Sequence, residues 1–414
     1  MENALLVCYT LLLEREKTGK GNTAMTNQGV LKHPHRFTHH GHHTHILRPV
    51  IEFFRANIVM TVALLAAVVT SLIVGVDAQY LGYFDFKTLT CLFCVLAVVC
   101  ALKNIRFFYI IAEQIVKKTK NARLSVLSLV YITFIGSMLI ANDMALLTFL
   151  PLGYFVLTTG KCEKYMAHTF ILQNIAANLG GMLTPFGNPQ NLYLYSHFDI
   201  PTLEFMGIML PPFLLAIAMI TLCCVLFIRP EPLEINASRA ELPKRRTALY
   251  LVLFALSILI VFRGIPYWIG LIVIPAVLAF ADRDALRKVD YPLLLTFVFF
   301  FIFAGNMARI DAVRALFSYL MERSTLLTST LSCQLISNVP SSILLSQFTE
   351  NYPELLVGVN IGGAGTLIAS LASLITFREY TCHNPHKTRY YVGIFSAYNF
   401  AFLGVMTLFM MIIM

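Results

Sequence analysis

Charge is scarce in this chain of 414 residues. Asp, Glu, Lys and Arg together make up only 13% of it, whereas hydrophobic residues make up 57%. A soluble globular protein carries about twice that charged fraction, so the composition excludes an ordinary soluble domain. Several apolar runs are close to the length that crosses the roughly 30 Å hydrocarbon core of a bilayer. The sequence therefore predicts a polytopic membrane protein.

The signatures of catalytic and metal sites are also missing. The nine cysteines lie mostly in apolar segments, without metal-ligand or disulfide spacing, and are interpreted as small apolar residues. There is no phosphate-binding loop and no nucleophile elbow. We therefore expect no enzyme and no resident cofactor. The net charge of +9 does not indicate nucleic-acid binding, because basic short loops are ordinary in membrane proteins.

The first 50 residues differ from the rest of the chain. The apolar run Ala4–Leu13 is too short to span a membrane, and it lacks the basic leader and the small-residue cleavage site of a signal peptide. A polar stretch rich in histidine follows between His33 and His45. We expect residues 1–50 to be a disordered cytoplasmic tail. Weak metal binding or pH sensing is the alternative.

Nine segments are expected to cross the membrane. They lie near residues 58–75, 88–103, 167–196, 204–228, 247–263, 267–281, 291–305, 355–377 and 391–414. Two further apolar stretches, 124–157 and 324–349, are each interrupted at a central Asn. We interpret these two stretches as re-entrant hairpins that return to the side they entered from.

The basic residues predict which side of the membrane each loop faces. With the N-terminus in the cytoplasm, the opposite side receives Lys87, Arg309, Arg314, Arg323 and little else. This bias follows the positive-inside rule, and it is lost if each hairpin counts as one crossing. We therefore expect a multi-pass protein of the plasma or inner membrane, with its C-terminus on the side opposite the N-terminus.

The two halves of the chain follow the same order of segments. Residues 85–89 and 290–294 each precede a span, an amphipathic stretch and a hairpin. The spans that follow these residues, 88–103 and 291–305, are the second and the seventh of the nine. Because they are an odd number of crossings apart, they cross the membrane in opposite directions, as in an inverted repeat. We expect a first repeat over 51–228, a cytoplasmic linker over 229–246 and a second repeat over 247–414.

The tip of each hairpin is polar. Asn142 and Asp143 lie at the first tip, and Ser337 and Asn338 lie at the second. In an inverted repeat the hairpins enter from opposite sides, so the tips are expected to meet near the membrane midplane. Either tip alone could be a structural turn, since Asn and Ser favour turns.

Each hairpin is followed by an apolar segment that cannot form a continuous helix. In 184–191, Pro185 and Pro189 remove backbone donors and Gly187 loosens the chain. Freed N–H groups can face an anion there, and freed carbonyl groups can hold a cation. In the second half, Gly362–Gly365 permits close backbone approach and Thr366 offers a hydroxyl ligand. The alternative for the glycines is tight helix packing.

Asp143 is the only charged residue between Arg123 and Lys161. An ionisable group at membrane depth indicates function, and this carboxylate could exchange a proton or a sodium ion in coupling. The alternative role is a helix cap that pairs free backbone N–H groups.

Two overlapping sets of site residues are predicted. The predicted substrate-binding residues are Asn142, Thr184, Gly187, Asn188, Ser337, Asn338, Gly363 and Thr366. The predicted cation-coupling residues are Asp143, Asn142, Asn188 and Asn338. No Lys or Arg belongs to either set, so we do not expect strong charge pairing with a di- or trivalent anion unless cations accompany it.

The motifs 174–191 and 336–340 resemble those of the ion transporter superfamily, over about residues 50–414. That superfamily includes citrate-transporter-like permeases, divalent anion/sodium symporters, and arsenite and sodium/proton transporters. The resemblance implies two inverted repeats and a transport part that moves relative to a scaffold. The symporters carry Ser-Asn-Thr at each tip. Here Ala141-Asn142-Asp143 is more similar to the arsenite and sodium/proton branch, which implies a protonatable site.

The sequence as a whole predicts a secondary active transporter. We expect it to move a small carboxylate or oxyanion by alternating access, coupled to H⁺ or Na⁺. A Na⁺/H⁺ antiporter and an arsenite-type efflux permease are the alternatives. The expected partners are the small anion, the coupling cation and the lipid bilayer, with a possible homodimer and no nucleic acid.

Overall fold

The computed structural model describes residues 51–233 and 242–414. The predicted tail, 1–50, and the middle of the predicted linker lie outside the described residues. Within them the regular structure is helical, apart from one isolated bridge between Asn121 and Pro232. The predicted all-α class is confirmed.

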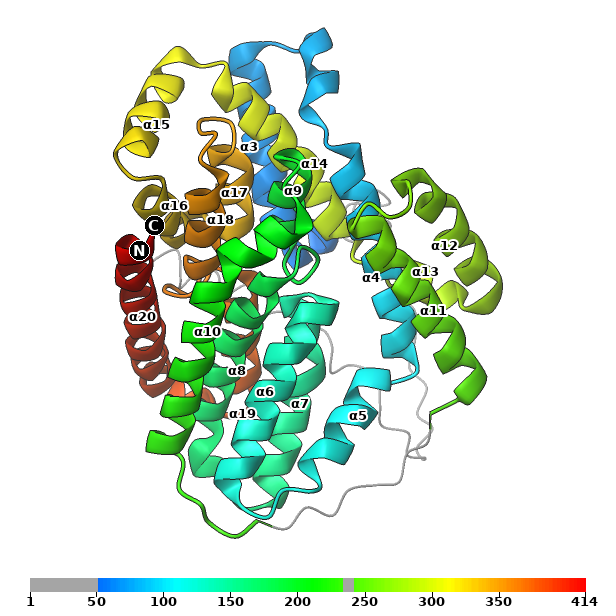
Figure 1. The fold of residues 1–414 in the computed structure, drawn as a ribbon, viewed down its shortest axis with the longest axis vertical. Coiled ribbons are helices and arrows are strands. Elements are labelled where there is room, and N and C mark those ends of the chain that lie inside the picture. Colours follow the sequence, from blue (N-terminus) through cyan, green and yellow to red (C-terminus); the bar gives the residue numbers. More distant parts are fainter. Residues whose placement is uncertain (1–50, 234–241) are drawn as a thin grey trace, which may run out of the picture.

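From residue 58 onward, the described part of the first half contains the following α-helices (Figure 1). They are α3 (Ile58–Val74), α4 (Phe86–Asn104), α5 (Phe107–Val116), α6 (Ala122–Ile140), α7 (Asn142–Thr159), α8 (Met166–Gly180), α9 (Pro189–His197) and α10 (Thr202–Phe227). Three short 3-10 helices connect them: η1 (Ala78–Tyr83), η2 (Glu163–Tyr165) and η3 (Gly181–Leu183).

The second half repeats much of this order. It contains α11 (Lys244–Val261), α12 (Tyr267–Ala281), α13 (Arg283–Arg287), α14 (Tyr291–Ala308), α15 (Asp311–Arg323), α16 (Thr325–Ile336), α17 (Asn338–Leu345), α18 (Tyr352–Ile361), α19 (Leu371–His383), η4 (Pro385–Lys387) and α20 (Thr388–Ile413). The predicted amphipathic stretches form α5 and α15. The predicted spans 167–196 and 355–377 are each split into two helices.

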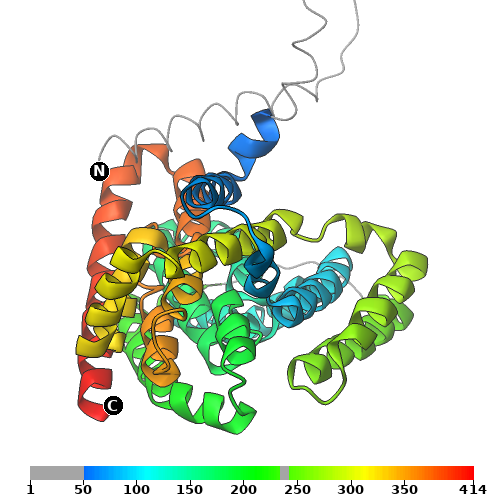
Figure 2. The same ribbon diagram turned by 90° about the horizontal axis from the view of Figure 1, so that it is seen from above.

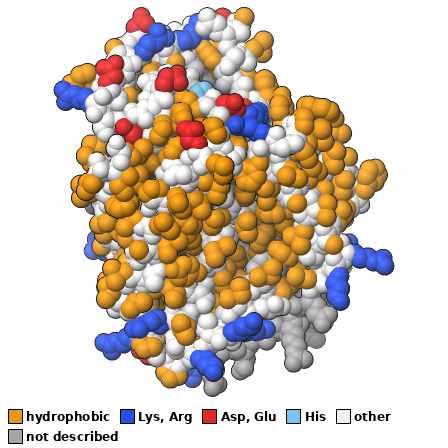
Figure 3. All heavy atoms as spheres, viewed as in Figure 1, with side chains coloured by type: hydrophobic (Ala, Val, Ile, Leu, Met, Phe, Trp, Pro, Cys, Tyr) orange, Lys and Arg blue, Asp and Glu red, His pale blue; other side chains and the backbone are white. Residues whose placement is uncertain are grey.

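Five of the described helices are long and apolar enough to cross a membrane: Phe86–Asn104, Ala122–Ile140, Thr202–Phe227, Tyr291–Ala308 and, counting η4 with α20, Pro385–Ile413. Shorter apolar helices include α3 and α12. Figure 3 shows hydrophobic side chains over the middle of the visible face, with charged side chains gathered at its two ends. This distribution is that of a protein whose middle lies in hydrocarbon. The sides assigned to the two termini stay predictions.

The two predicted hairpins form α6–α7 and α16–α17. Each turns at a residue with positive φ, Ala141 at 60° and Ser337 at 74°, a conformation uncommon outside glycine. The next residue begins the returning helix, and its side-chain oxygen accepts a hydrogen bond from the following backbone N–H. The distance between the side-chain Oδ1 and the backbone N of the next residue is 2.9 Å for both Asn142 and Asn338. An asparagine therefore stabilises each tip by pairing a backbone donor that the helix leaves free.

Contacts between the two halves come in pairs, in which each helix of one contact is replaced by its counterpart from the other half. α3 packs against α14, and α4 packs against α12; likewise α7 contacts α19, and α17 contacts α9. α10 and α20 also contact each other. In Figures 1 and 2, α11 and α12 lie at one side of the molecule and α20 lies at the opposite side. α8 lies between these sides, and all of its residues except His168 are buried.

Candidate functional site

The first broken helix is shaped by close backbone packing. α8 and η3 end before residues 184–188, and α9 begins after them with Asn188 at its N-cap. Gly187 lies so close to the carbonyl oxygen of Gly181 that a methyl group on its Cα would clash with backbone. Glycine is therefore required at this position, since fixed backbone cannot move aside.

The second broken helix is organised by one partly buried side chain. Gln334 of α16 donates from Nε2 to the carbonyl oxygens of Gly362 at 2.8 Å and Ala364 at 3.1 Å. Its Oε1 accepts from the backbone N–H of Thr366 at 2.9 Å. Gly365 has a φ of 127°, which favours glycine. Gln334 thus pairs three backbone groups that the interruption leaves outside a helix.

Two threonines hold the breaks against the hairpins. Thr184 Oγ1 donates to the carbonyl oxygen of Met138 at 2.8 Å, and Thr366 Oγ1 donates to that of Gln334 at 3.2 Å. Met138 and Gln334 each lie four residues before the asparagine at the tip of their hairpin. Both hydroxyl protons are therefore used in equivalent structural bonds, which the sequence prediction of ligand hydroxyls did not foresee.

Carboxamide groups join the two broken helices. Asn188 Nδ2 lies 3.2 Å from Asn360 Oδ1, and Gln190 Nε2 lies 3.4 Å from the same oxygen. Asn360 Nδ2 donates to Asn191 Oδ1 at 2.6 Å. All four side chains are buried. We call these residues, together with Asn178, the amide cluster.

The first hairpin tip bonds to the amide cluster, and the second tip lies near it. Asn142 Nδ2 donates to Asn178 Oδ1 at 3.2 Å. A methyl group on Gly363 would lie 3.2 Å from Asn338 Nδ2 and 3.7 Å from Asn178 Oδ1, so Asn178 and Gly363 lie between the two tips. Ser337 takes no part in these contacts and donates from Oγ to the carbonyl oxygen of Ala369 at 3.2 Å. The tips therefore approach each other, and their depth in the membrane stays a prediction.

Several oxygens in and beside the amide cluster are buried without a hydrogen-bond partner among the described residues. They are Asp143 Oδ1, Asn174 Oδ1, Asn188 Oδ1 and Gln190 Oε1. A buried acceptor without a donor is unfavourable by about 1–3 kcal/mol. Such oxygens suit a cation or a ligand that brings its own donors. Asn188 and Asp143, which have such unpaired oxygens, are two of the residues predicted to couple the cation.

The side chain of Asp143 makes no capping hydrogen bond in α7, which begins one residue earlier. It lies in the first turn of α7, where Asn142 Oδ1 accepts the hydrogen bond from the Asp143 backbone N–H. The carboxylate oxygen Oδ1 stays unpaired instead. Of the two predicted roles, the described contacts therefore give the cap to Asn142 and leave the carboxylate of Asp143 available.

Asn360, Asn178, Gln190, Asn191 and Gln334 were absent from the predicted site. Their signal was polarity within apolar helices, which marks function or specific pairing in membranes. Within the described part of the chain, the hydrogen bonds of the amide cluster involve amides and backbone groups and no Lys or Arg. In residues 51–233 and 242–414, no group of three or more His, Cys, Asp and Glu could hold a metal ion.

Two helix breaks that meet at a buried polar cluster within an apolar helical fold define the class of polytopic membrane transporters. Comparison with known proteins narrows the class. The model of the citrate transporter family matches residues 50–354, well over half of the chain, and the chain belongs to this family.

Two curated relatives agree with this assignment. An uncharacterized transporter of Methanocaldococcus jannaschii is 32% identical over 71% of this chain and 81% of its own length. The inner membrane protein YbiR of Escherichia coli is 29% identical over 66% of this chain and 74% of its own length. The protein is a transporter, as the sequence predicted, and not an enzyme.

Proposed function

We propose that this protein is a secondary active transporter that moves a small carboxylate or oxyanion, with H⁺ or Na⁺ as the coupling ion. The observation that carries this proposal is the convergence of two hairpin tips and two broken helices on the amide cluster. Broken helices in hydrocarbon are tolerated where they are buried or line a site. Citrate, the substrate that names the family, is the first anion to test.

The ends of four helices support anion binding at this cluster. α7 begins at Asn142, α17 begins at Asn338, and α9 and α19 begin after the N-cap residues Asn188 and Ser370. The N-terminus of a helix carries a partial positive charge and free N–H donors, which bind anions. A carboxylate can thus be stabilised without Lys or Arg. A highly charged anion such as citrate would bind such a site together with cations that offset its charge.

Unpaired oxygens support a coupling cation beside the anion. Asp143 Oδ1 and Asn188 Oδ1 lack donors within the described residues, and Asp143 can also take a proton. A cation or proton there would lower the net charge of the loaded site. Movement of the loaded site across the membrane would then be less unfavourable. This is the physical basis that we propose for coupling.

Exchanged contacts between the halves support alternating access. Two repeats of opposite orientation can adopt two related packings, in which the site faces one side or the other. The pairs α3–α14 with α12–α4, and α7–α19 with α17–α9, have the form expected of such repeats. In this proposal the hairpins and broken helices move against α4, α11, α12 and α14.

Cation/proton antiport is the second candidate, favoured by the unpaired carboxylate of Asp143 alone. Uptake by purified protein in proteoliposomes separates the two. The assay compares labelled citrate, sulfate and arsenite with an inward H⁺ or Na⁺ gradient and without one. Gradient-driven accumulation of an anion supports the proposal. Proton release driven by Na⁺, with no flux of these anions, would instead support the antiporter.

A further inference from the structure

A cavity of about 460 Å³, whose lining includes no residue of the amide cluster, lies beside the N-terminal end of α4. Its wall combines α9 and α17 with η1, α4, α12 and α14. On the α9 and α17 side of the lining are Tyr193 and His197 of α9 and Gln347, which follows α17; on the α4 and α12 side are Lys87 and Tyr267. In the proposed mechanism these two sides belong to parts that move relative to each other. We call this space the outer cavity.

Lys87 is the lysine of the outer cavity, and it is weakly engaged. Its Nζ lies 3.6 Å from Asp199 Oδ1, beyond hydrogen-bond distance, and its side chain is 33% exposed. The carboxylate of Asp199 is 78% exposed, so water screens the pair. Lys87 therefore has ammonium donors that a ligand in the cavity could use.

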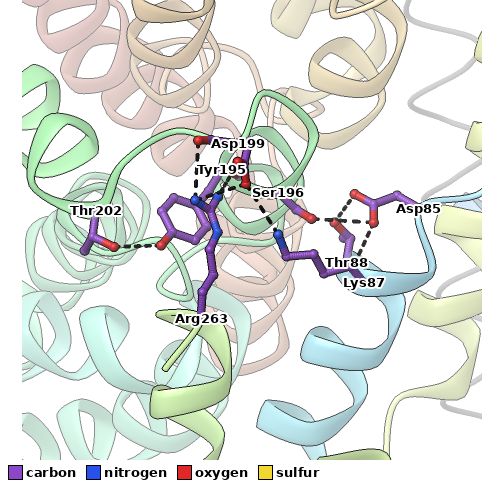
Figure 4. A network of polar contacts seen from close by, with 8 residues as sticks. All are labelled: Asp85, Lys87, Thr88, Tyr195, Ser196, Asp199, Thr202 and Arg263. Atoms are coloured by element: carbon purple, nitrogen blue, oxygen red, sulfur yellow. Dashed lines mark hydrogen bonds and ion pairs between the residues drawn. The ribbon is translucent and has the colours of Figure 1, made fainter. Parts of the chain in front are cut away.

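Asp199 has a second and stronger cationic partner. Arg263 Nη1 lies 3.1 Å from Asp199 Oδ1, while Arg263 Nη2 donates to the carbonyl oxygen of Tyr195 at 2.7 Å. The guanidinium also lies over the Tyr195 ring, 4.2 Å from its centroid. Figure 4 shows Asp199 between Lys87 of α4 and Arg263, which lies in the turn after α11. If Lys87 turned to another anion, Asp199 would keep Arg263.

The other acid of this region is already occupied. Asp85 Oδ1 accepts from the backbone N–H of Thr88 at 2.9 Å and from Ser196 Oγ at 3.5 Å, so it serves mainly as the N-cap of α4 (Figure 4). Further into the cavity, Tyr193 OH and Gln347 Nε2 lie 3.4 Å apart. The outer cavity thus offers one ammonium group with hydroxyl and amide groups, beside aromatic walls from Tyr83, Phe84 and Phe301.

We propose that the outer cavity is a second anion site, in which Lys87 binds the carboxylate of a small organic acid in competition with Asp199. The inference rests on the proposed function, because it takes the ligand to be the transported class of anion. Lys87 supplies the charge that the amide cluster lacks. The aromatic walls favour an organic acid over an inorganic oxyanion, since they offer apolar contact.

Binding of labelled citrate to the purified full-length chain tests this proposal. The measurement uses an Asn338→Ala background, in which the amide-cluster site is impaired. In that background we expect Lys87→Met to weaken citrate binding about tenfold, since a hydrogen bond to a charged group is lost. Lys87→Arg should retain most of the affinity, and Asp199→Asn should increase it by removing the competing carboxylate. Sulfate should compete poorly with citrate.

An ion pair elsewhere in the chain supplies the matched control. Lys164 Nζ of η2 lies 2.6 Å from Glu231 Oε1 in the predicted linker. Hydrogen bonds from Lys164 and Tyr165 hold the pKa of Glu231 below its ordinary value. The pair is thus ionised at neutral pH. Lys164→Met and Glu231→Gln change the same charges as the test variants, and we expect them to leave citrate binding unchanged.

Two results would overturn the inference. One is equal citrate affinity in the Asn338→Ala parent and its Lys87→Met variant, with both monodisperse by gel filtration. The other is absence of citrate binding in the parent. The proposed function is tested separately by uptake. If citrate binding depends on Lys87 but gradient-driven uptake is not observed, only the proposed function is rejected. If uptake is observed without binding that depends on Lys87, only the outer anion site is rejected.

Discussion

Asn188 and Asn360 are separated by 172 positions in the sequence, yet their carboxamides are 3.2 Å apart. This hydrogen bond joins the break before α9 to the helix before the second break. Two interruptions that would be unstable alone therefore satisfy part of each other's polar surface. The transport site that we propose is built on this contact.

The first prediction concerns Asn360. Asn360→Leu keeps a similar volume but leaves Asn188, Gln190 and Asn191 each without one partner. Each lost pairing is unfavourable by about 1–3 kcal/mol when the group stays buried. We expect a lower melting temperature in detergent and loss of uptake. Asn360→Leu protein with unchanged melting temperature and uptake would show that the amide cluster does not hold the breaks together.

A second prediction concerns glycine at the first break. Gly187→Ala should prevent the close approach to Gly181 and destabilise the fold by about 1–3 kcal/mol, the range for overpacking. Gly207→Ala is the matched control, because nothing lies within 4 Å of a methyl group added there. Thermal unfolding of both variants checks this. Equal melting temperatures would contradict the described packing.

The third prediction concerns Gln334. Gln334→Leu removes the bonds to Gly362, Ala364 and Thr366, so the second break should lose its shape and uptake should fall at least about tenfold. Leu335→Ala is the control, since the neighbouring side chain is 76% exposed. Gradient-driven uptake in proteoliposomes compares the two variants. A Gln334→Leu protein as active as Leu335→Ala would show that this break does not shape the site.

A fourth prediction concerns coupling. Asp143→Asn keeps the size of the side chain and some hydrogen bonding but cannot titrate. We expect it to bind citrate while losing the dependence of uptake on the H⁺ or Na⁺ gradient, because the unpaired carboxylate is the proposed cation ligand. Gradient-driven uptake across a pH series compares it with wild type. Coupling that persists unchanged in Asp143→Asn would assign the cation to other oxygens.

Much of the fold could be predicted because each element has a local cause. Pro185 and Pro189 each remove a backbone donor and Gly187 has a low helix propensity, so three such residues within five positions disfavour a continuous helix, and the structure breaks there. The asparagines at both tips act through their own neighbouring backbone. Such features depend on a few consecutive residues, so the sequence carries them directly.

Pairings across the fold could not be predicted in this way. Helical periodicity indicates that Asn360 is polar within an apolar segment, but it does not say which distant side chain it contacts. Thr184 and Thr366 offered hydroxyl groups, and only the folded chain shows that their protons serve the hairpin backbone. The outer cavity escaped prediction for the same reason, since its wall comes from six separate elements.

In the mechanism that we propose, the two hairpin tips and the amide cluster form the transport site. Asn142→Ala and Asn338→Ala test it with Asn399→Ala as control, a buried asparagine whose Nδ2 donates within its own helix to the carbonyl oxygen of Phe395 at 2.9 Å. Each of the three substitutions removes one buried carboxamide from a described helix.

The deciding measurement is gradient-driven citrate uptake in proteoliposomes that contain equal amounts of folded wild type, Asn142→Ala, Asn338→Ala or Asn399→Ala. We expect both tip variants to lose uptake at least about tenfold, since each loses a bond made at the site, and Asn399→Ala to stay close to wild type. Near-normal uptake by both tip variants would contradict the account, because the tips would then be structural turns and nothing more.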